Sequence, residues 1–346
     1  MSFTVTALYY SRNAATAAWL DMHAPRHDPD LIPARSQVAG TAWGRAPGSS
    51  RTVRHKGCDL TYWVRGEGPP VLFIQGVGVH ASGWTPQMDV LRARCQCAAF
   101  DNRGLGGSQP PGCPITVAQM AEDAAVILDA LGWPSAHIVG HSLGGLVALQ
   151  LALGARERVR SLSLLCTFAR GRDATPLSWW VLWTGLRTRI GTRRQRRHAF
   201  LKLVMPPGEL RTADRDRLAE QLAPIFGHDL GIEPPVTMKQ LSAMRRFDAT
   251  SRLGELARIP TLVVSAAHDR IAPPKCGRAL ADGIPGAHYV EVPDAAHGAP
   301  IQCARQINGL IADHLDRVER GVATFGETVR TVGRCGASDA TPHPPP

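Results

Sequence analysis

The sequence predicts an α/β fold in which a mostly parallel central sheet is flanked by helices and carries an inserted helical cap. Short apolar runs such as Val71-Leu72-Phe73-Ile74 are typical of strands that are covered on both faces. These runs alternate with segments of helical spacing, which implies parallel strands joined by right-handed crossovers. Residues 170–250 favour helices only and lie between two predicted strands, so we interpret them as the cap.

Two stretches, residues 51–169 and 251–320, carry the predicted sheet and its flanking helices. Strands are predicted at residues 60–64, 71–74, 96–100, 137–139, 159–165, 261–265 and 289–292, and helices at 117–131, 143–153 and 301–318. Gly132 and Pro134, directly after the first of these helices, are typical helix-ending residues. The core domain is therefore predicted from both stretches, with the cap between them.

Both ends of the chain are predicted to lie outside this core. Residues 1–50 have weak periodicity and many small, Pro and His residues, which indicates a poorly ordered extension. Residues 321–346 end in a Pro-rich run and are predicted to form a disordered tail. The first twenty residues lack the pattern of a secretory signal, and no stretch has the ~18 unbroken apolar residues of a membrane span.

The eight cysteines carry no metal-ligand spacing, so we expect no metal site. Cys95 and Cys97 are interpreted as small buried residues of a strand. In a chain without a secretory signal, eight cysteines favour reduced thiols and a cytoplasmic location.

The segment Gly140-His141-Ser142-Leu143-Gly144 contains the most informative motif, G-x-S-x-G, between a predicted strand and an apolar helix. A serine at so sharp a turn has strained backbone, so the residues two before and two after it must lack side chains. Gly145 would let the helix pack close to the sheet. The helix N-terminus directs its free N–H groups at the site, which favours an oxyanion. We predict Ser142 to be a catalytic nucleophile; the alternative is a glycine-rich turn without chemistry.

From about Arg54 to Arg317 the chain resembles the α/β-hydrolase superfamily, in its serine esterase or lactonase branch with a helical cap. Gln75-Gly76-Val77-Gly78 resembles the H-G-x-G oxyanion loop of that family, and residues 101–108 resemble its D-x-R-G-x-G-x-S turn. The resemblance implies a triad in the chain order Ser, Asp, His.

By this resemblance Asp269 is the triad acid and His297 the base. A serine hydroxyl needs a base to take its proton, and the base needs an acid that orients it. Asp269 follows a predicted strand at the carboxyl edge of the sheet, where ligands bind in such folds. His297 follows a small residue in the last loop, as the family pattern requires. A helix-capping or turn role remains the alternative for Asp269.

Other titratable residues near these motifs are given different roles. Asp294 is the nearest competitor of Asp269 but lies too close to the histidine loop. Asp101 and Arg103 are predicted to form an ion pair that stabilises their turn. Five more are not expected to react: His268 and His288 at the surface or in packing, His141 beside the nucleophile, and Glu122 and Asp123 in solvent or behind the site.

The resemblance also implies an oxyanion hole formed by the backbone N–H groups of Val77 and Leu143. Such donors stabilise the developing charge by ~3 kcal/mol each in a site that excludes water. This chain has Gln75 where the family usually has His. A backbone donor survives that exchange, but the hydrogen bonds around the loop must differ.

The cap combines an apolar stripe with a basic segment. The apolar residues recur at helical spacing, and they are predicted to pack onto the core, to roof the site, or both: Trp179, Leu182, Trp183, Leu186 and Ile190. Residues 170–202 contain nine Lys or Arg against one acid. We interpret this run as a solvated face, with attraction to an anionic substrate or a membrane surface as the alternative. No nucleic-acid partner is expected, because no reader motif accompanies the charge.

These features predict a serine hydrolase that cleaves a carboxylic ester or lactone through an acyl-enzyme on Ser142. The expected substrate is small and apolar, and no cofactor is expected. The same triad also serves carbon–carbon bond hydrolases, perhydrolases and acyltransferases, which the sequence does not separate. A ligand-binding receptor with little turnover is a further alternative. Epoxide hydrolases and dehalogenases of this fold are disfavoured, because their nucleophile is an aspartate.

Overall fold

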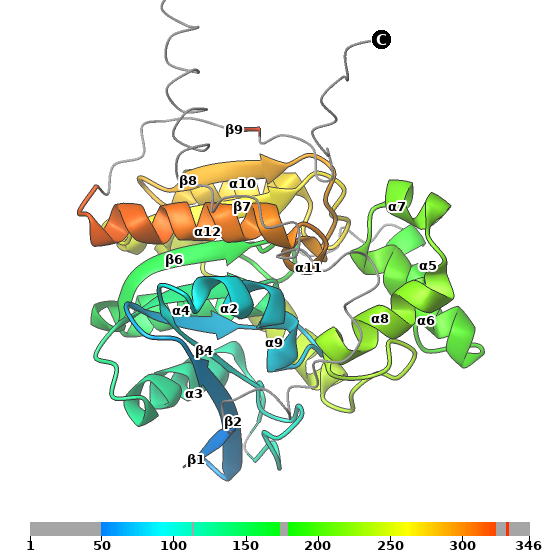
Figure 1. Ribbon diagram of the computed structural model, residues 1–346, viewed down its shortest axis with the longest axis horizontal. Coiled ribbons are helices and arrows are strands. Elements are labelled where there is room, and N and C mark those ends of the chain that lie inside the picture. The colour runs from blue at the N-terminus through cyan, green and yellow to red at the C-terminus, as the bar shows by residue number, and fades with distance from the viewer. Residues whose placement is uncertain (1–49, 113, 174–178, 323–329, 332–346) are drawn as a thin grey trace, which may run out of the picture. The chain divides into compact units, whose positions relative to one another are not determined.

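The computed structural model describes residues 50–112, 114–173, 179–322 and 330–331, and a nine-stranded sheet lies at its centre (Figure 1). The strand order is β1-β2-β4-β3-β5-β6-β7-β8-β9. β2 pairs antiparallel with β1 and β4, and all other neighbours pair parallel, which confirms the predicted mostly parallel α/β fold. The strands are β1 (Arg51–His55), β2 (Cys58–Arg65), β3 (Pro70–Ile74), β4 (Gln96–Phe100), β5 (Ala136–His141), β6 (Val159–Leu165), β7 (Thr261–Ala266), β8 (His288–Val292) and β9 (Arg330–Thr331).

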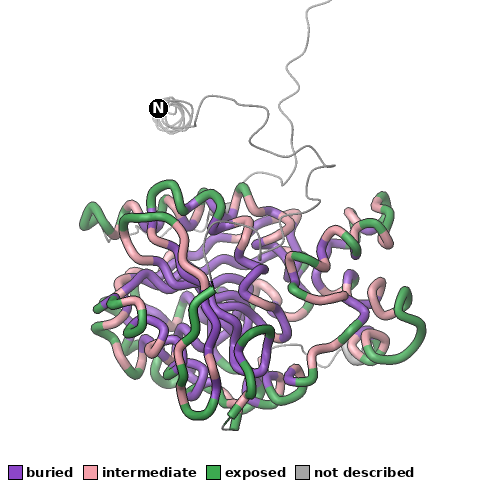
Figure 2. The backbone as a smooth tube through the Cα atoms, turned by 60° about the horizontal axis from the view of Figure 1, so that its bottom comes forward, coloured by how far each residue is buried: buried purple, intermediate pink, exposed green. Residues whose placement is uncertain are grey.

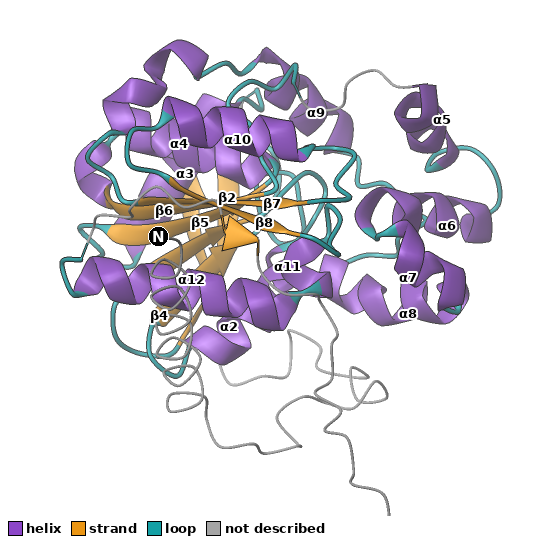
Figure 3. Ribbon diagram, turned by 90° about the horizontal axis from the view of Figure 1, so that it is seen from above, coloured by secondary structure: helices purple, strands orange, loops and turns teal. Residues whose placement is uncertain are grey.

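Helices cover both faces of the sheet (Figure 3). One face carries α3 (Val117–Ala130), α4 (Leu143–Gly154) and α10 (Pro274–Gly283), and the other carries α2 (Thr85–Leu91) and α12 (Ala304–Glu319). Along β3, Leu72 and Ile74 join the apolar cluster of the first face, whereas Val71 and Phe73 join that of the second. Strand side chains alternate between faces, so a doubly covered strand requires an unbroken apolar run. Figure 2 shows these strands as buried backbone beneath partly exposed helices.

The predicted helix over residues 301–318 is interrupted. The chain instead forms a short helix, α11 (Ala299–Gln302), and then α12. Between them Cys303 has φ −111° and ψ 39°, which is not a helical conformation. Ile301, before the break, packs against the apolar cluster of the cap helices, whereas Ile307 and Ile311 of α12 join that of the second sheet face.

Between β6 and β7 the described chain is helical, in the region predicted as the cap. Its helices are α5 (Trp179–Arg187), α6 (Arg193–Val204), α7 (Pro207–Thr212), α8 (Arg215–Phe226) and α9 (Thr237–Arg246). α6, α7 and α8 share a further apolar cluster, which includes Leu201 and Phe226 and also Val79 from the loop after β3. α9 differs, because its Ala243 and Met244 join the core cluster beside α4. The predicted boundaries of core and cap stay predictions.

Most of the two predicted terminal segments lies outside the described residues. Nothing is described of residues 1–49, 323–329 or 332–346. Within the stretch predicted to be a disordered tail, Arg330 and Thr331 pair with β8 as the strand β9.

The apolar stripe of α5 does not pack onto the core as predicted. Trp183, Leu186 and Ile190 are 54%, 45% and 55% exposed. The side chains of Trp179 and Leu182 lie outside the described residues. Packing onto the core is thus wrong for the three described side chains, because helical periodicity identifies an apolar face but not the surface that it contacts. The alternative, that this face roofs the site, stays a prediction.

Three arginines of α6 pair with acids of the cap, and the side chains of Arg193 and Arg194 remain exposed to solvent, at 61% and 72%. Arg193 and Arg197 both contact Asp229, and Arg194 contacts Asp216. Hydrogen bonds from Arg197 and then Arg193 hold the pKa of Asp229 well below its usual range. The basic run in the sequence is therefore matched in space by acids of α8 and of the loop that follows it.

The predicted ion pair between Asp101 and Arg103 is wrong. Asp101 accepts hydrogen bonds from the backbone N–H groups of Ala81 and Gly107 at 2.8 and 3.0 Å. Arg103 is fully buried and binds both carboxylate oxygens of Asp123, at 2.7 and 2.5 Å. Asp123 is likewise buried and is not a solvated residue. Asp101 was predicted as the partner of Arg103 because it is close in sequence, but the fold places the Arg103 guanidinium against Asp123 on α3.

We expect Arg103→Met to lower the free energy of unfolding by about 3–5 kcal/mol, because it leaves a buried carboxylate without its bidentate partner. Arg54→Met is the control, since its pair with Asp59 is exposed and should contribute only about 0–1 kcal/mol. Urea denaturation of both variants measures the difference. Equal losses in the two variants would contradict the prediction.

His314 on α12 should make the stability of the fold depend on pH. Burial lowers the pKa of His314 to about 3. An unfolded His titrates near ~6.5, so below that pH the unfolded chain binds a proton that the folded chain refuses. The free energy of unfolding should therefore fall as pH drops from about 6.5 towards 3, and His314→Met should weaken this fall. Urea denaturation at several pH values checks it, and an unchanged slope would count against it.

The expectation of eight reduced thiols is wrong at Cys303, which is disulfide-bonded. Five described cysteines are free: Cys58, Cys95, Cys97, Cys166 and Cys276. Cysteine spacing carried no sign of a pairing, because a disulfide depends on which segments the fold brings together. Among the described residues, no helix combines the length and apolar composition that crossing a membrane requires.

Candidate active site

Ser142 lies at the turn between β5 and α4 with φ 53° and ψ −118°, a strained backbone for any residue but glycine. The glycines of the motif are required by close approach. A Cβ at Gly140 would lie 2.4 Å from the carbonyl oxygen of Gly144, and one at Gly144 would lie 2.0 Å from that of Ile74. Gly145 passes equally close to the chain after β6, with 2.5 Å to the nearest side-chain atom. The steric reason expected from the sequence thus applies at all three glycines.

Ser142, His297 and Asp269 form one hydrogen-bonded series. His297 Nε2 lies 3.1 Å from Ser142 Oγ, and His297 Nδ1 lies 2.8 Å from Asp269 Oδ2. Asp269 Oδ1 accepts from the backbone N–H groups of Ile271 and Ala272, each at 2.8 Å, which fixes the carboxylate. The three residues are 4–6% exposed. The structure therefore brings together the three residues predicted to form a triad, from the carboxyl ends of β5, β7 and β8.

The segment Gln75–Gly78, here called the oxyanion loop, passes directly over the serine. A Cβ at Gly76 would lie 3.2 Å from Ser142 Cβ. The next residue is Val77, and Leu143 is the first residue of α4. Within the described part of the chain, the backbone N–H groups of Val77 and Leu143 have no hydrogen-bond acceptor. Leu143 thus directly follows Ser142, and Val77 follows Gly76, the residue that approaches Ser142.

Gln75 holds the first half of this loop. Its side-chain Oε1 accepts from the N–H of Gly76 at 2.9 Å, and its backbone carbonyl accepts from Asn102 Nδ2 at 3.0 Å. The side chain is buried. In place of the usual His, the Gln75 side-chain amide ties the oxyanion loop to itself, and the Asn102 side chain ties the backbone of the loop to the turn after β4.

Comparison with known proteins decides the family. The family model of the alpha/beta hydrolase fold matches residues 69–302, a range that contains Ser142, Asp269 and His297. The chain belongs to the α/β-hydrolase fold family. The relative and the two solved structures described next carry the names of a carbamate hydrolase, an enol-lactonase and an esterase.

This hydrolase is 34% identical to a protein of Azorhizobium caulinodans named "Putative carbamate hydrolase RutD". The alignment spans 242 residues, which are 69% of this chain and 88% of the relative. It is 26% identical to the enol-lactonase from Burkholderia xenovorans LB400, with a TM-score of 0.65 over 77% of this chain and 100% of that one. It is also 26% identical to a thermophilic esterase from Thermogutta terrifontis, with a TM-score of 0.63 over 79% and 99%.

In this hydrolase, His141 contacts His297. Its Nε2–H donates to the backbone carbonyl of His297 at 2.9 Å, and the two rings are 4.9 Å apart. Burial, and then the neighbouring His297, lower the pKa of His141 to about 3, so this ring stays neutral near pH 7. The interpretation of His141 as a residue beside the nucleophile agrees with this contact.

Cys166 is a residue of the site that sequence reasoning missed. It follows β6 with φ 47° and is buried. Burial, and then the Asp269 carboxylate, raise the pKa of the Cys166 thiol well above its usual range, so the thiol can donate to that carboxylate. Its position directly after a predicted strand, at the same sheet edge as Asp269, was the available signal.

The other residues weighed against the triad stand apart from it. Asp294 contributes its backbone carbonyl, which accepts from Gln302 Nε2 at 2.9 Å. His268 has an exposed side chain, and its backbone N–H donates to Ala295. Among the described residues, no three His, Cys, Asp or Glu side chains are grouped so that they could hold a metal ion.

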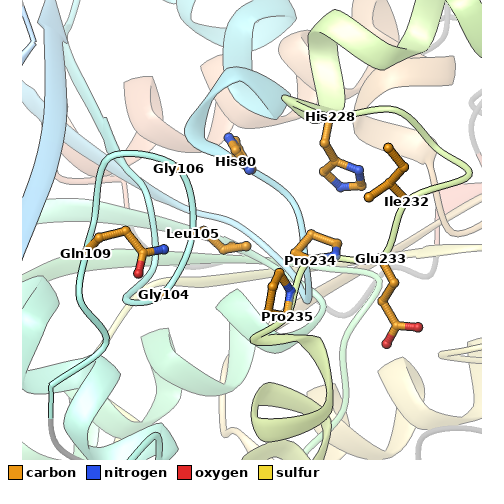
Figure 4. Close-up of a pocket in the computed structure, with 10 residues that line it drawn as sticks. All are labelled: His80, Gly104, Leu105, Gly106, Gln109, His228, Ile232, Glu233, Pro234 and Pro235. Carbon is orange, nitrogen blue, oxygen red and sulfur yellow. The ribbon is translucent and has the colours of Figure 1, made fainter.

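A cavity of about 250 Å³ lies between the turn after β4 and the cap loop that follows α8 (Figure 4). It is lined by His80, Gly104, Leu105, Gly106, Gln109, His228, Ile232, Glu233, Pro234 and Pro235. Ser142, Asp269 and His297 do not line this cavity. It does adjoin the oxyanion loop, because His228 contacts the carbonyl oxygen of Gly78.

Proposed function

We propose that this chain hydrolyses a carboxylic ester or a lactone through an acyl-enzyme on Ser142. The observation that carries the proposal is the buried series Ser142–His297–Asp269. At 3.1 Å, His297 Nε2 is placed to take the hydroxyl proton as Oγ attacks the carbonyl carbon. Asp269 accepts from Nδ1–H, which keeps Nε2 free to act as the base.

The rest of the cycle follows from the same groups. As Oγ adds, negative charge develops on the carbonyl oxygen, and the N–H groups of Val77 and Leu143 stabilise it. His297 then protonates the leaving alkoxide, which departs from an ester and stays tethered in a lactone. Water, deprotonated by His297, releases the acid and restores Ser142.

Carbamate hydrolysis is the second candidate. It is favoured by the 34% identity to a relative that carries a carbamate hydrolase name. A carbamate has the same electrophilic carbonyl, so Ser142 would form a carbamoyl-enzyme with the same oxyanion and the same proton transfers.

We propose a small apolar substrate for a cytoplasmic enzyme, with no nucleic-acid partner. The structure makes membrane attachment through the basic run of the cap, which was the alternative in the sequence analysis, less favourable. Arg193, Arg194 and Arg197 already contact acidic side chains, so little of their charge is left for lipid head groups.

The test combines turnover with covalent labelling. Short, medium and long p-nitrophenyl esters, several lactones and an aryl carbamate are assayed, and a p-nitrophenyl phosphonate is mapped by peptide mass spectrometry. We expect one adduct per chain, on Ser142, and turnover of esters or lactones. Turnover of the carbamate alone would select the second candidate. Labelling without turnover of any of the three would point to carbon–carbon cleavage, perhydrolysis or acyl transfer. No labelling would leave a ligand-binding role and overturn the proposal.

A further inference from the structure

The oxyanion loop is held at its far end by the cap. Gly78 donates its N–H to Gln240 Oε1 at 2.9 Å, and its carbonyl oxygen accepts from His228 Nε2 at 2.9 Å. Gln240 lies on α9, and His228 lies on the loop between α8 and α9, where Figure 4 shows its side chain. Both backbone polar groups of one residue are thus bound by side chains from the insert between β6 and β7.

This places Val77 between two fixed peptide groups. On one side, Gly76 is held by Gln75 of the core. On the other, the Val77–Gly78 peptide is held by Gln240. The direction of the Val77 N–H depends on the backbone torsions between these two anchors, since peptide groups themselves are planar. Releasing the Gly78 anchor would let the Val77 N–H turn away from the oxyanion.

Gln240 is poorly explained by packing alone. Its side chain is fully buried, and its Nε2 has no hydrogen-bond partner among the described residues. The amide cannot be reversed, because Oε1 must face the Gly78 N–H. A buried donor without an acceptor is unfavourable, so an apolar side chain of the same size would pack at lower cost. What Gln240 adds over a leucine is the acceptor for Gly78.

We propose that Gln240 is a positioning residue for the oxyanion hole, with His228 as its partner, so that the cap fixes the Val77 donor. The inference rests on the proposed function, because it concerns the charge that forms on the carbonyl oxygen. That charge exists in the transition state and not in the bound substrate. Loss of the anchor therefore lowers kcat and leaves KM nearly unchanged.

The test compares Gln240→Leu and His228→Phe with the wild-type chain on its best ester. Removing an oxyanion donor outright costs about 10²–10³-fold in kcat, so misplacing one should cost roughly 10-fold or more, with KM within about 3-fold. Affinity for a trifluoromethyl ketone, which forms an oxyanion on Ser142, should fall by the same factor as kcat/KM. Gln195→Leu is the control, since it breaks the capping box of α6 but does not touch Gly78; its kcat should be unchanged.

The outcomes separate three cases. A folded Gln240→Leu with wild-type kcat and ketone affinity overturns the inference, and so does an equal loss in Gln195→Leu. If Gln240→Leu does not fold, His228→Phe decides by the same two readouts, since its side chain is only half-buried. A wild-type chain that neither turns over esters nor binds the ketone would instead overturn the proposed function itself.

Discussion

Ser142→Ala should lower kcat/KM for the best ester by roughly 10⁴-fold or more, because it removes the atom that forms the acyl-enzyme. The fold should survive. Alanine keeps the Cβ that Ser142 already places beside Gly76, and the hydroxyl contacts His297 rather than the core. Steady-state kinetics with a thermal unfolding curve for each protein measures both parts.

Ser163→Ala is the matched control. Ser163 is a buried serine on β6 whose hydroxyl has no hydrogen-bond partner among the described residues. Its loss should change neither turnover nor the phosphonate adduct. A Ser142→Ala protein that keeps a tenth of the wild-type rate would mean that another group performs the attack.

Gly144→Ala should prevent the turn at Ser142 from closing and lower the free energy of unfolding by more than about 3 kcal/mol. Its new Cβ would lie 2.0 Å from the carbonyl oxygen of Ile74 and 2.9 Å from that of Gln75. These are backbone atoms of the central strand and the oxyanion loop, and neither can move aside without disturbing the sheet.

Gly154→Ala is the control for this prediction, because it lies at the other end of the same helix with nothing within 4 Å of its new Cβ. It should be neutral or stabilise by up to about 1 kcal/mol, as alanine does in helices. Chemical denaturation of both variants measures the contrast. Similar stabilities would show that the turn tolerates a side chain at Gly144.

The sequence predicted structure best where a local steric contact or burial restricts which residues can occupy neighbouring positions. The glycines around Ser142 are spaced by steric contact within one turn, so the motif could be recognised without the fold. Central strands such as β3 were predicted because burial on both faces forbids polar residues. Asp269 and His297 needed the resemblance, since their meeting with Ser142 depends on β5, β7 and β8 ending at the same edge of one sheet.

Contacts between distant segments could not be predicted in this way. Arg103 was assigned the acid nearest in sequence, but its partner Asp123 comes from a helix on the sheet face. β1 was missed because it is an exposed edge strand without an apolar run. Gln240 and His228 carry no motif at all, and they reach Gly78 across more than a hundred residues of sequence.

The two bonds to Gly78 bear on how this enzyme could be re-engineered. A cap inserted into such a fold can be regarded as a separate module that selects the substrate and that could be replaced by the cap of another enzyme. Here, a graft that replaced residues 170–250 would also remove both side chains that hold the loop over the serine. Such a chimera would change its turnover number along with its specificity, unless the donor cap supplied an amide acceptor and an N–H donor at the same two points.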